Sequence, residues 1–277
     1  MRLVMLVFLS LLGALLSATL IRLAPGYGVD ERELDPRLSQ ASVESIRRAN
    51  RLHSGLFSYY RHFLEGAVRG DFGNSQWLER PISTLVRERF PVTLRSVVLG
   101  TLVAWAAALA GSLAAAFFPG IATEISGTVL SSILIALPTA AVAMFAVYLR
   151  APVFLAIAVV SFPKLFRYLR NLLAHASAQP YILAAEARGI RKARILSRHL
   201  FPNVSPALFA LLGVSLSVGF GAAIPIEALC DSPGIGQLAW QAALNRDLPL
   251  LMTVTMLVTV ITAGANSLSD LADRWAG

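Results

Sequence analysis

The sequence predicts an all-α integral membrane protein. Of its 277 residues, 56% are hydrophobic and 14% are charged, and the mean hydropathy of +0.65 is too high for an ordinary soluble domain. A helix needs about 20 predominantly apolar residues to cross a bilayer, because its backbone groups must be satisfied inside the segment. Five uncharged stretches reach or approach that length: Leu3–Ile21, Ser96–Thr123, Ile125–Leu149, Leu200–Ile226 and Leu248–Ser269.

A sixth stretch, Ala151–Pro163, has 13 uncharged residues before Lys164. We expect it to span as well, because a helix places Lys164, Arg167 and Arg170 on one face, from which they can extend toward lipid phosphates. The first stretch, Leu3–Ile21, could instead be a signal peptide, but its apolar run is long for one. No clean cleavage site precedes Pro25.

The charge distribution predicts the orientation. Between Lys164 and Asn203 there are eight basic residues and one acidic residue, which together supply seven of the eight net positive charges. The positive-inside rule places this loop in the cytoplasm, so the isoelectric point of about 10.4 does not indicate a nucleic-acid partner. With six spans the segment from Ala24 to about Pro91 is external, and with five spans it is internal.

This segment is the only polar stretch of domain size. Near its end, Pro81–Phe90 is amphipathic, with Ile82 and Leu85 on the apolar side, and we expect a helix lying at the membrane surface. The predicted organisation is a first transmembrane helix (1–24), an external insert (25–93) and a five-helix core (94–277). The core contains a cytoplasmic coupling loop at 171–203.

Several functions are excluded by what is missing. The chain has no phosphate-cradling Gly-x4-Gly-Lys-Ser/Thr loop, so it is not itself the ATPase of a pump. A lone Cys230 and four scattered histidines predict no metal site. The acids Glu124, Glu227 and Asp270 fall near span ends, where we expect them to be solvated. No catalytic set stands out, which leaves an intramembrane enzyme as a weak alternative.

Two features of the spans bear on helix packing. Gly213, Ser217 and Gly221 form a stripe of small residues that favours close helix approach, either within the subunit or at a subunit interface. Pro138 is expected to kink the third span.

A motif stands within the basic loop. The run Tyr181-Ile182-Leu183-Ala184-Ala185-Glu186-Ala187-Arg188-Gly189 is followed, 13 residues after Gly189, by Pro202. It resembles the cytoplasmic signature of ABC-importer permeases, Glu-Ala-Ala-x3-Gly-x9-Ile-x-Leu-Pro, although the signature's Glu falls on Leu183. Small residues allow close approach, and Gly189 can end the helix with a turn that suits a residue without Cβ.

Further ordered matches resemble the dipeptide/oligopeptide/nickel class of ABC permeases. They are Arg22–Gly26, Gly70–Ser75, Arg80–Ile82, Arg89–Leu94, Ile226–Ala228, Ser232–Leu238, Asn245–Pro249 and Asn266–Leu271. Each match alone is weak, but their order and spacing over residues 22 to 271 are specific.

This resemblance implies a six-helix type I ABC importer fold with an external helical insert between spans 1 and 2. The chain would be a multi-pass permease subunit of a bacterial inner membrane, importing peptides or similar small polar solutes. Its partners would be a second homologous permease, two cytoplasmic ATPase subunits, an external solute-binding protein and the lipid bilayer. ATP and Mg would bind the ATPases, and this chain would bind no cofactor. The alternative is a stand-alone channel or scaffold without an ATPase.

The resemblance also implies two groups of site residues and no catalytic or metal residue. Contacts that couple the chain to the ATPase would come from Tyr181, Ala184, Ala185, Glu186, Arg188, Gly189 and Pro202. Residues of the external gate, or contacts to the binding protein, would be Glu227, Asp231, Pro233, Gly234, Gly236 and Asp247, with solvated loop acids as the alternative.

Overall fold

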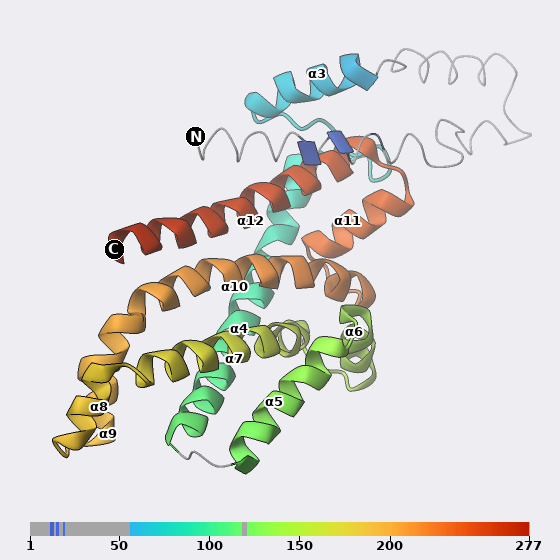
Figure 1. The fold of residues 1–277 in the computed structure, drawn as a ribbon. Coiled ribbons are helices and arrows are strands. Elements are labelled where there is room, and N and C mark those ends of the chain that lie inside the picture. Colours follow the sequence, from blue (N-terminus) through green and yellow to red (C-terminus); the bar gives the residue numbers. More distant parts are fainter. Residues whose placement is uncertain (1–11, 14, 17–18, 20–55, 118–120, 277) are drawn as a thin grey trace, which may run out of the picture. The chain divides into compact units, whose positions relative to one another are not determined.

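The computed structural model describes residues 12, 13, 15, 16, 19, 56–117 and 121–276. Its elements over these ranges are helices. The one β-type pairing within these ranges is an isolated antiparallel bridge between Asn74 and Pro81, so the all-α prediction is confirmed. The helices are α3 (Leu56–Val68), α4 (Ile82–Phe117), α5 (Ile121–Ala136), α6 (Thr139–Tyr148), α7 (Val153–Ser177), α8 (Pro180–Ala187), α9 (Lys192–Ile195), the π-helical turn η2 (Leu196–Leu200), α10 (Phe201–Leu229), α11 (Ile235–Leu244) and α12 (Leu248–Ala276) (Figure 1).

The chain forms two compact units, which are described separately. One comprises Met1–Phe90 with Leu238–Val260, and the other comprises Pro91–Gln237 with Ile261–Gly277. The predicted division at residues 24 and 93 follows chain order, whereas this grouping joins part of the C-terminal region to the N-terminal region. The first predicted span, the Arg22–Gly26 match and residues 25–55 of the insert lie wholly or largely outside the described residues.

In the first unit, α3 packs on the beginning of α12. Phe63 of α3 is buried with Leu248 and Met252 of α12, and Tyr60 and Phe72 pack around them. This apolar contact holds α3 against α12, because burial of each large apolar side chain contributes about 1.5–3 kcal/mol to the free energy of folding.

The amphipathic segment predicted at Pro81–Phe90 is the first part of α4. The helix does not end at Phe90 but continues through Pro91 to Phe117. Ile82 and Leu85 are 0% and 2% exposed, so their face is buried against protein. The segment is therefore the start of a longer helix whose apolar face packs on protein, and its position at the membrane surface stays a prediction.

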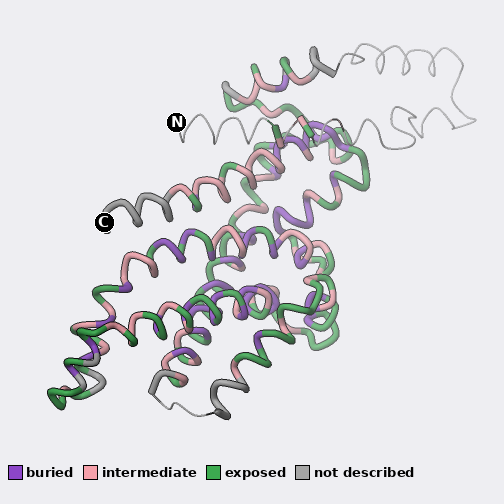
Figure 2. Tube along the Cα trace, in the orientation of Figure 1, coloured by how far each residue is buried: buried purple, intermediate pink, exposed green. Residues whose placement is uncertain are grey.

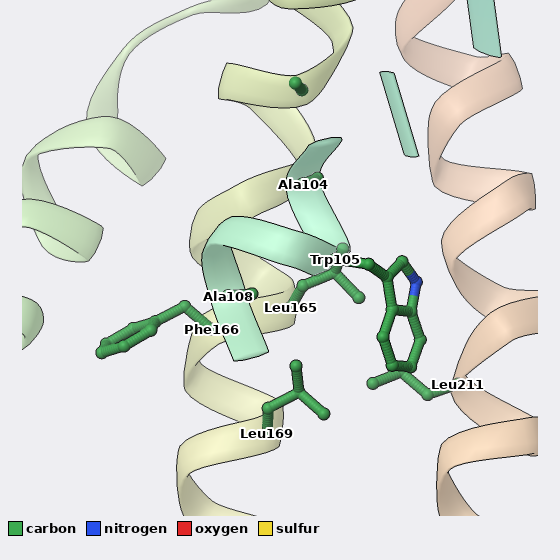
Figure 3. Close-up of a cluster of buried hydrophobic side chains, with 8 residues drawn as sticks. Ala104, Trp105, Ala108, Leu165, Phe166, Leu169 and Leu211 are labelled. Carbon is green, nitrogen blue, oxygen red and sulfur yellow. The ribbon is translucent and has the colours of Figure 1, made fainter. Parts of the chain in front are cut away.

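The core of the second unit lies where α4, α7 and α10 meet. Ala104, Trp105 and Ala108 of α4 pack against four buried residues of α7 and against Leu211 of α10 (Figure 3). The indole nitrogen of Trp105 donates a hydrogen bond of 3.0 Å to Ser215 Oγ, which satisfies the one polar group of this large side chain. Buried and exposed residues alternate along α7 and α10, as expected for helices with one packed side (Figure 2).

Among the described residues, three helices are long and apolar enough to cross a membrane: Ile82–Ala115, Leu196–Leu229 and Leu248–Ser267. Large apolar side chains such as Leu102, Met144 and Phe209 remain exposed on the isolated chain, as expected for surfaces that meet lipid or other subunits. Six spans stay a prediction for two reasons. Leu3–Ile21 lies largely outside the described residues, and α7, which carries Lys164, Arg167 and Arg170 in its second half, is not among the three candidate helices.

The predicted kink at Pro138 is confirmed. Gly127–Ala136 and Thr139–Tyr148 are two apolar helices that meet at 96°, so this stretch is a broken span or a re-entrant loop. Pro138 stands at the N-cap of α6 with extended backbone angles, and its missing N–H and its ring prevent the helix from continuing through it.

Two of the basic residues of α7 hydrogen-bond within the chain. Arg167 donates to Ser131 Oγ and Ser132 Oγ on α5, at 3.1 and 2.7 Å, and Arg170 donates to Thr128 Oγ1 at 2.6 Å. The hydroxyls of α5 therefore give both side chains partners within the chain, and their contact with lipid phosphates stays a prediction.

The small residues of α10 have three different surroundings. Gly213 is buried, while Ser217 Oγ lies 2.9 Å from the carbonyl oxygen of Thr262 and 2.8 Å from Asn266 Oδ1 on α12. A Cβ at Gly221 would meet no atom within 4 Å, which leaves the subunit-interface alternative open there. The close helix approach occurs instead at Gly219, where a Cβ would lie 3.0 Å from Val97 and 3.1 Å from Thr101 of α4.

The substitution Gly219→Leu should therefore destabilise the second unit by about 1–3 kcal/mol or more, because the side chain has no room against α4. Gly221→Leu, two residues away on the same helix, should leave stability nearly unchanged. The midpoint of thermal unfolding of the detergent-solubilised chain measures both. Equal midpoints for the two variants would contradict this packing.

Candidate functional site

Helix α8 and the turn after it form the first candidate site. The helix ends at Ala187, and Gly189 adopts φ +71°, a left-handed conformation that glycine accepts without strain. The backbone N–H of Ile190 donates to the carbonyl of Ala185 at 3.2 Å, which is the outer hydrogen bond of a Schellman motif. The predicted helix end at Gly189 is confirmed.

Helix α8 has an inner and an outer face. Ile182 and Ala185 are buried in a cluster with Leu173 of α7, Ile195 of α9 and Leu200 of η2. On the other side Tyr181, Ala184, Ala187, Arg188 and Gly189 are exposed, and we call these five residues the α8 outer face. Ala185 therefore packs on the chain's own core and is not available to an outside partner, contrary to the prediction. The side chain of Glu186 lies outside the described residues.

A hydrogen bond joins the two halves of the signature. Pro202 is exposed in the first turn of α10, where a proline needs no N–H partner. Next to it, Asn203 Nδ2 donates to the Tyr181 hydroxyl at 3.0 Å and to the carbonyl of His199 at 2.9 Å. The π-helical turn η2 lies between α9 and α10. Such turns within α-helices are frequent at functional sites. Helix α8 is thus attached to the base of α10 by apolar packing and by one polar contact.

The second candidate site is the buried carboxylate of Glu227, near the end of α10. Its Oε2 accepts hydrogen bonds from Thr93 Oγ1 at 3.0 Å and from the backbone N–H of Gly236 at 2.8 Å. Thr93 Oγ1 in turn accepts from the N–H of Ile235 at 2.7 Å. The side chains of Glu227 and Thr93 therefore cap the N-terminal end of α11, where the helix dipole favours an anion.

Gly234 is required by this arrangement. A Cβ at Gly234 would overlap the Glu227 carboxylate, and one at Gly236 would lie 2.5 Å from the Cα of Ile224. Glu227 is 0% exposed. The expectation that Glu227 is solvated is therefore wrong, and in this conformation its side chain cannot reach a binding protein.

A third site, in the first unit, is the carboxylate of Asp247, which is also 0% exposed. Its Oδ2 accepts from Ser75 Oγ at 2.5 Å and from the N–H of Trp77 at 3.1 Å, and its Oδ1 accepts from the N–H of Leu250 at 3.1 Å. Asp247 is thus the N-cap of α12 and also holds the loop that follows α3. Because the Asp247 side chain is buried, it cannot contact a binding protein in this conformation.

Asp231 and Pro233 remain exposed in the turn between α10 and α11. Asp231 adopts φ +50°, and its carboxylate accepts a hydrogen bond from Gln237 Nε2. Beside it, burial raises the pKa of the Cys230 thiol, so the thiol stays protonated near neutral pH and is a poor nucleophile. Among the described residues there is also no cluster of His, Cys, Asp and Glu suited to a metal ion.

Residues 107–276 match the family described as "Binding-protein-dependent transport system inner membrane component". The chain belongs to this family.

Members with similar sequences include the oligopeptide transport system permease protein AppB of Bacillus subtilis (strain 168). It is 24% identical over 287 residues, covering 93% of this chain and 90% of the relative. The oligopeptide transport system permease protein OppB of Haemophilus influenzae is 26% identical over 277 residues, covering 91% and 88%. The probable peptide ABC transporter permease protein y4tP of Sinorhizobium fredii is 27% identical over 283 residues, covering 91% and 89%.

Membership in the binding-protein-dependent permease family confirms the predicted resemblance. The chain is a multi-pass protein of the bacterial inner membrane with the type I importer domain, and it is a permease subunit of an ATP-driven importer. The family is a transporter family and not a family of enzymes.

Sequence reasoning missed the partners of the two buried acids in this permease. Thr93 and Ser75 each lie in one of the motifs that resemble the family, and each pairs with an acid from another such motif, across 134 and 172 residues of chain. The polar residues of both motifs are visible in the sequence, but the sequence does not indicate which residue of one motif contacts which acid of another. Neither pairing follows from helical periodicity, which reports only on neighbours within a segment.

The capping of α11 can be tested with a double-mutant cycle on Glu227 and Gly234. Gly234→Ala should lower stability by about 2–4 kcal/mol because its Cβ overlaps the carboxylate, and Glu227→Ala should cost a similar amount through lost charge-assisted hydrogen bonds. In the double variant the overlap is absent, so the loss should fall short of the sum by about 1–3 kcal/mol. Thermal unfolding of the solubilised chain is the measurement, and strictly additive losses would refute the contact.

The Asp247 site can be tested by limited proteolysis. Asp247→Ala should release the loop around Ser75 and Trp77 and so increase cleavage after the exposed Glu79 by a glutamate-specific endoproteinase at least several-fold. Asp247→Asn should have a smaller effect, because asparagine still caps a helix and can pair with Ser75. Cleavage after Glu65, also exposed but outside the loop held by Asp247, serves as the control. Unchanged cleavage after Glu79 in the alanine variant would show that Asp247 does not hold the loop.

Proposed function

We propose that this permease imports peptides or similar small polar solutes, together with a second, related permease, two cytoplasmic ATPase subunits and an external solute-binding protein. The family description supports a binding protein, and the names of AppB and OppB support a peptide solute. ATP and Mg would bind the ATPase subunits, and the role of this chain is to bind its partners and to move.

The observation that carries the proposal is the two-faced packing of α8. Its outer face presents Tyr181, Ala184 and Ala187, whose alanines leave room for close approach by a partner, beside the exposed cation of Arg188. Its inner face is anchored by Ile182 and Ala185 in the cluster at the base of α10. A partner that grips the outer face therefore pulls on a membrane helix.

This geometry gives a coupling mechanism. When the ATPases close on ATP, they displace α8, and the Tyr181–Asn203 hydrogen bond and the apolar cluster carry the displacement into α10. The spans then shift between inward-open and outward-open states. A cytoplasmic nucleotide can do this only if the partner's affinity for α8 differs between the two states, which makes the coupling reciprocal.

The docking role predicts that Ala184→Asp reduces co-purification of the ATPase at least tenfold, a loss of about 1.4 kcal/mol, while leaving the chain's own stability unchanged. A buried aspartate, Ala185→Asp, should instead lower the midpoint of thermal unfolding. Ala174→Asp, the same change at an exposed position on α7, is the matched control.

Affinity purification in mild detergent, with quantitative identification of the bound subunits, measures these effects. Normal amounts of ATPase on the Ala184→Asp variant would show that α8 is not the docking element. Recovery of a second permease without any ATPase from the wild-type chain would favour the channel or scaffold alternative.

A further inference from the structure

Three exposed arginines follow the α8 outer face along the chain, and we call Arg191, Arg194 and Arg198 the arginine face. Arg194 and Arg198 are four residues apart and so lie on one side of the α9–η2 segment, and Arg191 stands one turn earlier, at the beginning of α9. In the same segment Ile195 and Leu200 are buried in the cluster that also holds α8. The arginine face shares no residue with the α8 outer face, to which docking of the ATPase is assigned.

The arginine face has no partner within the described part of the chain. No described residue forms an ion pair or a hydrogen bond with its three guanidinium groups. Arg167 and Arg170 differ, because they donate to hydroxyls of α5. In the sequence, Glu186 is the one acid between Lys164 and Asn203. The arginine face therefore presents uncompensated positive charge to whatever lies beside it.

The arginine face lies at the beginning of a membrane helix. The candidate span Leu196–Leu229 starts within η2 and continues through α10. Its uncharged run, Leu200–Ile226, has 27 residues, about 40 Å at 1.5 Å per residue, which is close to the thickness of a bilayer with its headgroup regions, about 40–45 Å. Arg198 stands two residues before this run. Because a guanidinium group inside the hydrocarbon is costly, the run fits the bilayer with Arg198 at the level of the headgroups.

The same side of the helix is apolar farther along α10. Phe209 follows Arg198 by eleven residues, about three helical turns, and is 62% exposed. A phospholipid has two matching parts, an anionic headgroup at the bilayer edge and acyl chains below it. An acidic surface on the ATPase could meet the arginines, but it would not reach Phe209, which lies within the uncharged run. The combination therefore favours a lipid over a protein partner.

We propose that the arginine face binds the anionic headgroups of phospholipids in the inner leaflet, with the acyl chains against the side of α10 that carries Phe209. Clusters of Lys and Arg beside a membrane helix attract such headgroups, and each cation near the surface contributes roughly fivefold in affinity. The positive-inside rule places these arginines on the cytoplasmic side. The site is independent of the transported solute and of the docking of the ATPase on α8.

Binding of defined lipids to the full chain in mild detergent tests the site. The chain would be titrated with phosphatidylglycerol and, separately, with phosphatidylcholine, and the bound lipids would be counted by native mass spectrometry. We expect phosphatidylglycerol to bind at least tenfold more tightly, with a preference that falls as the salt concentration rises. Changing Arg191, Arg194 and Arg198 together to glutamine should lower the affinity for phosphatidylglycerol at least tenfold and leave that for phosphatidylcholine unchanged.

Two further sets of variants separate charge from folding. Changing the same three arginines to lysine should keep the preference, because lysine retains the charge. Each glutamine substitution made alone should lower the affinity for phosphatidylglycerol roughly fivefold, so the result does not depend on the triple variant. All three side chains are exposed, and the midpoint of thermal unfolding should stay at the wild-type value in every variant.

Exposed arginines elsewhere in the chain supply the matched control. Changing Arg69, Arg95 and Arg150 together to glutamine removes the same charge and should leave the preference for phosphatidylglycerol intact. Equal affinity of the wild-type chain for the two lipids would overturn the assignment. An equal loss in the control, or a preference that survives the glutamine changes at the arginine face, would overturn it as well.

Co-purification of the ATPase, measured on the same variants, separates the two partners. We expect the glutamine variant of the arginine face to retain the ATPase, whereas Ala184→Asp loses it. Loss of the ATPase with unchanged binding of phosphatidylglycerol would assign the arginine face to the ATPase and overturn the lipid site. Failure of the lipid site is thus distinguishable from failure of the proposed transporter assembly.

Discussion

The packing of α10 against α7 is the contact on which the rest of the second unit depends. Leu200 and Val204, at the base of the long helix, hold α8 through its inner face, and Leu211 closes the core around Trp105. Farther along the same helix, Glu227 holds the beginning of α11. The same long helix therefore contacts α8 near its beginning, the core around Trp105 in its middle and the first turn of α11 near its end.

The two buried acids show how a membrane protein of low charge uses its carboxylates. Each satisfies backbone N–H groups at the beginning of a helix: Glu227 caps α11, and Asp247 caps α12. Each also accepts from a hydroxyl that is distant in sequence, so one anion completes a helix end and attaches another segment to it. A substitution at either acid would leave several buried donors without partners, which explains why such costly groups are placed there.

The positive charges divide into three environments. Arg188 belongs to an exposed surface beside small residues, Arg167 and Arg170 donate to hydroxyls of α5, and Lys164 is exposed halfway along α7. The positive-inside rule treats all of them as one cytoplasmic cluster. Their different partners arise because successive turns of α7 pass different neighbours, so equal charges have unequal surroundings.

By itself the sequence determined the helical class, the membrane setting, the break at Pro138 and the end of α8 at Gly189. Each of these depends on local physics: apolar length, a missing N–H, or a backbone conformation open to glycine. Only the tertiary structure decided that Ala185 faces inward, that Glu227 and Asp247 are buried, and that Arg167 and Arg170 donate to hydroxyls of α5. These outcomes depend on which distant segment supplies a hydroxyl, a backbone donor or an apolar surface, and periodicity along one helix contains no information about that neighbour.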